Sequence, residues 1–134
     1  MNFPQQELII QDKIEDVYDV ILIAGDESYV LQMIDDILAD IPEEYSLGQN
    51  YPNPFNPTTK IDFALPRTGD VSLVIYNLMG QQVRTLLAKN MEYGFHTITW
   101  NGLDQSGRPV SSGVYFSELR ARSFRQTKKM LMLK

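Results

Sequence analysis

Few residues of this sequence could carry catalysis, and they lie far apart along the chain. His96 is the only histidine, and no acid or nucleophile nearby in the sequence completes a catalytic group with it. A glycosidase needs two carboxylates facing one bond, but each acid after residue 44 lies in a different segment. The sequence also lacks a glycine-rich phosphate loop and a cluster with metal-ligand spacing. We therefore predict a chain that is not an enzyme and binds no cofactor, with a structural role for His96. The five separated acids are Asp62, Asp70, Glu92, Asp104 and Glu118.

The opening segment resembles the second half of a dockerin repeat. Its aspartates Asp12, Asp16 and Asp19 lie where the calcium-loop residues and the following helix of that repeat would be. A calcium loop of the EF-hand kind needs oxygen donors at its first, third and fifth positions and a glycine at its sixth. Two of those donors and the glycine are missing here, so we do not expect calcium binding. The residues at these four positions are Leu8, Ile10, Asp12 and Lys13.

The elements before residue 45 are predicted to be mostly helical. Apolar residues from Val30 to Ile41 recur at helical spacing, Asp26 and Ser28 offer caps, and Pro42 follows the end, so we predict a helix from Glu27 to Ala39. Residues 16–25 are ambiguous between a strand and a helix, because apolar residues at i, i+3, i+4 and i+7 compete with a high content of β-branched residues. A helix is the interpretation we favour for them.

From residue 45 onward, short β-rich runs alternate with glycine, proline and asparagine. Alternating apolar residues predict strands near 45–47, 60–65, 71–75, 81–87, 96–100, 114–122 and 125–133. Asn77 to Gly80 reads as the turn of a hairpin. About seven strands in roughly ninety residues is the size of an immunoglobulin-like antiparallel β-sandwich. We expect Trp100 to be its central aromatic residue.

The most unusual stretch carries three prolines in six residues. Because proline fixes its own φ and pushes the preceding residue toward extended backbone, this stretch cannot be a helix or a central strand. We interpret it as a rigid crossover that Tyr51 and Phe55 pin to the sandwich, in preference to a peptide-recognition surface. Its residues are Tyr51, Pro52, Asn53, Pro54, Phe55, Asn56 and Pro57.

Composition limits the architecture to one main domain. A chain of 134 residues can bury one core of about a hundred residues, and hardly two. There is no cysteine, so packing has to hold the fold together. The first residues do not have the pattern of a signal peptide, and no apolar run is long enough for a transmembrane helix. We therefore expect that the chain is part of a longer exported protein.

Charge divides the chain into two parts. Residues 1–44 hold 12 acids and one base, for a net charge of -11, whereas residues 45–134 hold 5 acids and 11 bases, for a net charge of +6. Such asymmetry indicates segments of different origin or segments that attract each other, although solvated charge on two unrelated faces would look the same. The basic part could approach anionic surfaces. We expect no nucleic-acid partner, and we divide the chain into a leader, 1–44, and a module, 45–134.

The module resembles a known family over nearly its whole length. The runs "YSLGQNYPNPFNPTTKIDFALPRTGDVSLVIYNLMGQQVRTL", "GFHTITWNGLDQSGRPVSSGVYF" and "KKMLMLK" are similar to the type A C-terminal sorting domain of the type IX (Por) secretion system in Bacteroidetes-like bacteria. The shared features include the proline-rich opening and the turn formed by Trp100, Asn101 and Gly102. The stretch "WNGLDQSGRPVSSGVYF" also resembles the immunoglobulin-like domain of flagellar hook-capping proteins.

The sorting resemblance implies a non-catalytic module of a larger cargo protein whose working domain lies N-terminal to it. In that family an outer-membrane translocon recognises the module after transit through the periplasm. A processing peptidase can then remove it, and the cargo reaches the medium or the cell surface, where it can be joined to lipopolysaccharide. Carried over by position, cleavage would fall within residues 41–47. The recognition signal would comprise Gly113, Val114, Tyr115, Lys128, Lys129, Met130, Leu131, Met132, Leu133 and Lys134.

Two alternatives remain open at this point. The terminal strand is predicted to place Met130 and Met132 on one face and to expose its lysines to a receptor, but lysines also protect an edge strand from aggregation. The whole chain could instead be a structural or adhesive sandwich that binds carbohydrate or a neighbouring domain. An exposed row of aromatic residues would favour that function, whereas most aromatics here alternate in phase with the core. Apolar residues on the 27–39 helix would also permit self-association.

Overall fold

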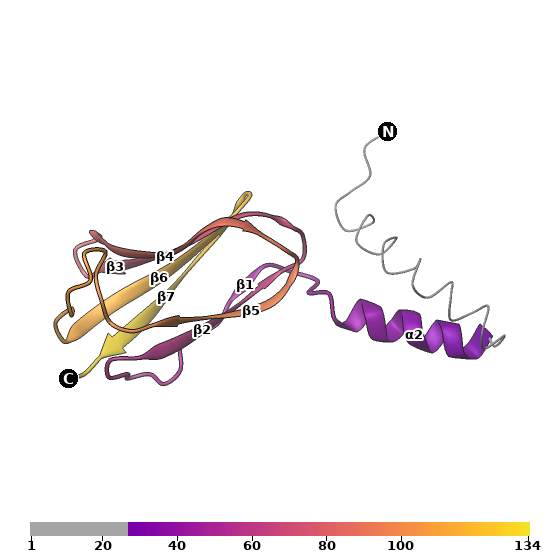
Figure 1. Cartoon of the computed structure of the whole chain (residues 1–134), viewed down its shortest axis with the longest axis horizontal. Coiled ribbons are helices and arrows are strands. Elements are labelled where there is room, and N and C mark those ends of the chain that lie inside the picture. The colour runs from indigo at the N-terminus through magenta and orange to yellow at the C-terminus, as the bar shows by residue number, and fades with distance from the viewer. Residues whose placement is uncertain (1–26) are drawn as a thin grey trace.

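A computed structural model describes residues 27–134 of the chain (Figure 1). The dockerin-like segment and the helix expected over residues 16–25 lie outside the described residues. The described part begins with helix α2 and continues with seven strands in two antiparallel sheets, which confirms the mainly β, immunoglobulin-like sandwich. The elements are α2 (Glu27–Ala39), β1 (Ser46–Leu47), β2 (Thr59–Leu65), β3 (Gly69–Asn77), β4 (Gln82–Met91), β5 (Gly94–Trp100), β6 (Gly113–Ala121) and β7 (Phe124–Met132).

The two sheets differ in size. The smaller sheet has the order β1-β2-β5, and the larger has the order β4-β3-β6-β7, so β7 is an edge strand. Strand β3 pairs with β4 through the Asn77 hairpin, where the Asn77 side chain accepts hydrogen bonds from the backbone N–H groups of Met79 and Gln81. Strands β6 and β7 form a second hairpin that keeps one register throughout. The hairpin predicted at Asn77 to Gly80 is therefore present.

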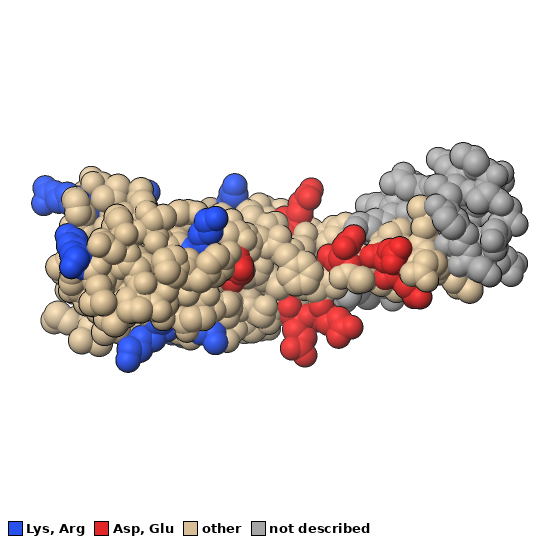
Figure 2. Space-filling view, turned by 90° about the horizontal axis from the view of Figure 1, so that it is seen from below, with Lys and Arg blue, Asp and Glu red and all other residues tan. Residues whose placement is uncertain are grey.

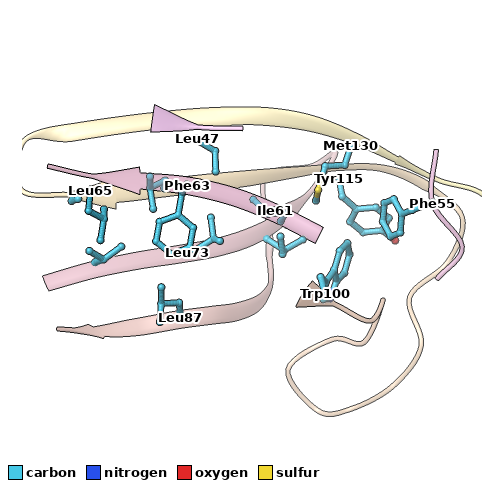
Figure 3. Close-up of a cluster of buried hydrophobic side chains, with 14 of the residues drawn as sticks. Leu47, Phe55, Ile61, Phe63, Leu65, Leu73, Leu87, Trp100, Tyr115 and Met130 are labelled. Carbon is cyan, nitrogen blue, oxygen red and sulfur yellow. The ribbon is translucent and has the colours of Figure 1, made fainter. Parts of the chain in front are cut away.

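Strand alternation builds the core between the sheets. On β2, residues Ile61, Phe63 and Leu65 point inward, while Lys60 and Asp62 are exposed. Strands β3 and β6 repeat the pattern, and Trp100 at the end of β5 is fully buried, as predicted for the central aromatic residue (Figure 3). Each inward apolar side chain of this size stabilises the fold by roughly 1.5–3 kcal/mol through burial.

Helix α2 extends from one end of the sandwich, and the C-terminus lies at the opposite end (Figure 1). The helix has the predicted bounds, ends before Pro42, and exposes Leu31 and Leu38. Self-association through this helix stays a prediction. No helix within residues 27–134 is long and apolar enough to cross a membrane. Acidic side chains gather at the α2 end, whereas basic side chains are spread over the sandwich (Figure 2).

Candidate functional site

The terminal strand β7 contributes directly to the core. It pairs with β6 along its whole length, with Gly113 opposite Met132 and Tyr115 opposite Met130. Met130 and Met132 are both 0% exposed. The predicted signal is therefore part of an ordered sheet, and its two methionines face the sandwich interior as the alternation predicts.

The lysines of β7 do not form a single exposed row. Because successive strand residues point to opposite faces, Lys128 shares the inward phase of Met130 and is half-buried opposite buried Ser117. Lys129 points outward and is exposed, as is Lys134 beyond the strand. Lys128 is therefore less exposed than Lys129 and Lys134.

The proline-rich segment bonds to the outer edge of β7. The backbone N–H of Phe55 donates to the carbonyl of Leu131 at 3.0 Å, and the N–H of Leu133 donates to the carbonyl of Phe55 at 3.0 Å. The side chain of Asn53 accepts from the N–H of Leu131 at 3.0 Å. These bonds occupy the last part of the β7 edge, which an added strand could otherwise use. The segment is therefore a crossover bonded to the terminal strand, which agrees with the interpretation we favoured from sequence.

An aromatic cluster joins this crossover to the Trp100 turn and to Tyr115 of the predicted signal (Figure 3). Phe55 is 1% exposed, and its ring centroid lies 5.5 Å from that of Trp100. Trp100 meets Tyr115 edge to face at 5.4 Å. Such aromatic pairs contribute roughly 0.5–1.5 kcal/mol beyond their buried area. Three motifs that are distant in sequence thus share one packed site, which we call the terminal cluster: Phe55, Trp100, Gly102, Tyr115, Met130 and Met132.

Tyr51 and Phe55 hold the crossover in different ways. Its side chain is 46% exposed, so it does not pin the segment by burial as Phe55 does. Its hydroxyl instead donates to Asp62 at 3.2 Å, and its backbone bridges to Lys60. Desolvation and the neighbouring Asp62 carboxylate raise the pKa of Tyr51. The crossover is fastened to β2 by hydrogen bonds at Tyr51 and to the core by Phe55.

Gly102 lets the turn after Trp100 lie close to the crossover. Its φ is +74°, and a Cβ atom there would lie 3.0 Å from the backbone oxygen of Pro57 and 3.0 Å from the Met132 side chain. The turn is held by the Trp100 indole N–H, which donates to the carbonyl of Leu103 at 2.9 Å. Asn101 beside it is exposed. The backbone requires glycine at position 102 for both conformation and space.

Replacing Gly102 with alanine tests this contact. We expect Gly102→Ala to lower the free energy of unfolding by roughly 1–3 kcal/mol, because the new methyl group meets backbone and a positive φ disfavours it. Gly80→Ala is the matched control, since Gly80 has φ +79° with nothing within 4 Å of the added Cβ. Urea unfolding followed by Trp100 fluorescence would measure both. Equal losses in the two variants would contradict close packing at Gly102.

His96 has the surroundings of a structural residue. Its ring stacks on Phe63 with centroids 5.3 Å apart, and its Nε2 lies 2.7 Å from the carbonyl oxygen of Glu92. Residues 27–134 contain no group of three or more histidine, cysteine, aspartate or glutamate side chains that could hold a metal ion. The geometry around His96 provides packing and a single hydrogen bond.

Sequence reasoning missed a charged cluster on the outer face of the larger sheet. Glu118 is buried, and it accepts hydrogen bonds from Arg120 at 2.7 Å and Arg125 at 2.9 Å. A signal was available, because Glu118 and Arg120 are two residues apart and so share one strand face. The register between β6 and β7 does not follow from the sequence pattern, so the pattern does not place Arg125 beside Glu118 and Arg120.

The chain is similar to several solved structures. The crystal structure of dimeric latent PorU from Porphyromonas gingivalis aligns over 69% of this chain and 10% of its own, with 19% identity and a TM-score of 0.53. FlgD from P. aeruginosa aligns over 55% of this chain and 60% of its own, with 23% identity and a TM-score of 0.44. PorZ of P. gingivalis, a surface component of its type IX secretion system, aligns over 69% of this chain and 12% of its own, with 20% identity and a TM-score of 0.44.

This chain spans about a tenth of the PorU chain, and at these identities the likeness concerns the fold alone. No curated protein matches the chain. The sequence model of the FlgD Ig-like domain matches residues 50–123, which include the crossover, the Trp100 turn and most of both sheets. That match covers more than half of the sequence, and the chain belongs to the FlgD Ig-like domain family.

Proposed function

We propose that this chain is a type A sorting module that directs a larger cargo protein through the type IX secretion system, without catalysis of its own. The observation that carries the proposal is the terminal cluster. There the proline-rich motif, the Trp100 turn and the terminal strand, which together carry the sequence resemblance, are joined by backbone bonds and aromatic packing.

The layout of the chain ends supports this function. Helix α2, which would connect to the cargo, lies at one end of the sandwich, and the terminal strand finishes at the other (Figure 1). A cargo domain would therefore leave the terminus accessible. The exposed residues Lys129, Leu133 and Lys134 are the part of the signal that a receptor could contact, because Met130 and Met132 are occupied by the core.

The partners follow from the same proposal. They are an outer-membrane translocon, a processing peptidase and an N-terminal cargo domain, with no nucleic acid, and the destination is the cell surface or medium after transit through the periplasm. Within residues 41–47, Glu43 and Glu44 are exposed, whereas Ile41 is buried and Ser46–Leu47 is paired in β1. We place the accessible cleavage stretch at Glu43 and Glu44.

Export of a reporter tests the sorting role. A periplasm-targeted fluorescent protein would be fused to residues 1–134 in a bacterium with a working type IX system. The test variant carries Lys129→Gln with Lys134→Gln, and the matched control carries Lys89→Gln with Arg108→Gln, which removes equal charge from exposed positions elsewhere. We expect the test variant to lower secretion by at least about tenfold, the effect of losing roughly 1.4 kcal/mol of recognition, and the control to secrete normally.

Two outcomes would count against the proposal. Normal secretion of the folded test variant would show that the charges of Lys129 and Lys134 are not part of the recognition signal. Retention of the unaltered fusion in the periplasm would refute the sorting role and favour a structural or adhesive sandwich. One observation supports that second candidate: Phe95 is 69% exposed and Tyr51 is 46% exposed, both on the outer face of the smaller sheet.

A further inference from the structure

The outer face of the larger sheet carries a carboxylate buried beneath two arginines. Glu118 is 5% exposed, and each of its oxygens accepts a hydrogen bond from a different guanidinium Nε, from Arg120 at 2.7 Å and from Arg125 at 2.9 Å. The arginine side chains themselves are 54% and 66% exposed. The carboxylate therefore holds both arginines by their inner nitrogens and leaves their outer ends in solvent.

The β6–β7 register creates this arrangement. Arg120 pairs with Arg125, and Glu118 pairs with Thr127, so all four side chains share one face of adjacent strands. Burial pushes the pKa of Glu118 upward, but the hydrogen bonds and positive charges of Arg120 and Arg125 outweigh burial and lower this pKa. Glu118 is consequently ionised at neutral pH, and the arginines are anchored by a full negative charge.

The cluster has an excess of positive charge and unused donors. Two guanidinium groups face one carboxylate, which leaves a net charge of about +1. Within residues 27–134, the side chains of Arg120 and Arg125 each make one hydrogen bond, from Nε to Glu118. The terminal Nη groups of both therefore remain available. Paired Nη donors match the spacing of the oxygens on a phosphate or carboxylate.

A groove begins at the arginines and continues toward the Asn77 turn. Its volume is about 340 Å³, at the lower end of the range for small-molecule sites. It is large enough for a sugar ring bearing a charged group. Its walls contain aromatic and aliphatic surface, hydroxyl groups and the two guanidinium groups, and are formed by Tyr76, Leu78, Phe116, Arg120, Arg125 and Thr127.

The position of the groove argues against a peptide as the occupant. Peptide strands bind at sheet edges, where free backbone groups supply most of the affinity. This groove lies over the face of β3, β6 and β7, whose backbones are paired with one another. Apart from Gly80 in the turn, every residue that lines the groove has a side chain. A ligand is therefore recognised chiefly through its charge, its hydroxyl groups and its ring faces.

We propose that this groove binds a sugar carrying an oxyanion, either a sugar phosphate or a uronate. Arg120 and Arg125 hold the oxyanion through their Nη groups, and the ring lies against the surface formed by the neighbouring side chains of Tyr76 and Phe116. Glu118 is a positioning residue that fixes both arginines. The site stands independently of the proposed sorting function, because it lies on the outer face of the larger sheet, whereas the terminal cluster is packed on the inner face.

Titration of the intact chain, residues 1–134, tests the site. The probes are glucose 6-phosphate, glucuronate, inorganic phosphate and glucose, and binding is followed by NMR through the arginine Nε–H signals. We expect the two anionic sugars to bind at least about tenfold tighter than phosphate or glucose. Arg125→Gln and Arg120→Gln should each weaken them about tenfold. Arg108→Gln, the control at an exposed arginine elsewhere, should leave binding unchanged.

Glu118→Gln distinguishes the role of Glu118 in positioning the two arginines from the effect of net charge on anion binding. It raises the net positive charge, so simple electrostatic attraction would strengthen binding. We expect weaker binding instead, together with displaced Nε–H signals of Arg120 and Arg125 before any ligand is added. Any of four results would overturn the proposal. The anionic sugars could bind no tighter than inorganic phosphate, or glucose could bind as tightly as they do. Arg108→Gln could weaken sugar binding as much as Arg125→Gln, or a glutamate-rich peptide could bind tighter than either anionic sugar.

Discussion

Deletion of residues 128–134 is expected to unfold the sandwich. The deletion removes Met130 and Met132, both fully buried, and half of the strand that pairs with β6. It also removes the backbone partners of Phe55. Truncating one buried methionine to alanine costs about 2–5 kcal/mol, and a whole domain is stable by only about 5–15 kcal/mol. The combined loss is thus comparable to the entire stability of the module.

Circular dichroism and Trp100 fluorescence during urea unfolding would measure this effect. We expect the truncated chain to lack a cooperative transition. The control carries Lys128→Gln, Lys129→Gln and Lys134→Gln, which keeps every core side chain and should keep the transition. A cooperative transition at an unchanged urea midpoint in the truncated chain would show that β7 adds little to the core.

This result bears on how a secretion experiment is designed. A truncated module that fails to be secreted could have lost its signal or its fold, and the two causes would look the same. Substitution at the exposed Lys129 and Lys134 removes charge without touching Met130 or Met132. The lysine variants therefore separate recognition from folding.

Phe55→Ala is expected to be the most destabilising single substitution in the crossover. Phe55 is 1% exposed and packs against Trp100, and it is the only residue of the proline-rich segment 51–57 with a buried side chain. Loss of a buried phenylalanine costs about 3–5 kcal/mol. Release of the crossover would also uncover the edge of β7 at Leu131 and Leu133. Urea unfolding at equilibrium would measure the change.

Tyr51→Ala provides the comparison within the same segment. Its ring is half exposed, and its side chain contributes one hydrogen bond to Asp62, worth about 0.5–1.5 kcal/mol. We expect Tyr51→Ala to cost less than half as much as Phe55→Ala. Similar losses would mean that the crossover is held by its hydrogen bonds as much as by the buried ring.

Local pattern was sufficient for most of the secondary structure. The apolar spacing of residues 27–39 predicts α2, and period-two alternation predicts the inward residues of β2, β3 and β5. The Asn77 turn follows from residues that favour tight turns. These features depend on residues close together in the chain, which is why periodicity and turn chemistry identify them.

Pairing between distant segments decided the sites. Lys128 faces inward because it is on the same face of β7 as Met130 and Met132, which pack into the core. Phe55 covers part of the β7 edge because its backbone bonds to Leu131, which is far away in the sequence.

The sequence by itself determined the fold class, the helix, the strands and the family resemblance, because these follow from local periodicity and short motifs. Only the tertiary structure decided which residues meet: the terminal cluster, the exposed position of Tyr51 and the burial of Glu118 between Arg120 and Arg125. The physical reason is that strand register and sheet order are set by the packing of the whole core, and no segment carries that information alone.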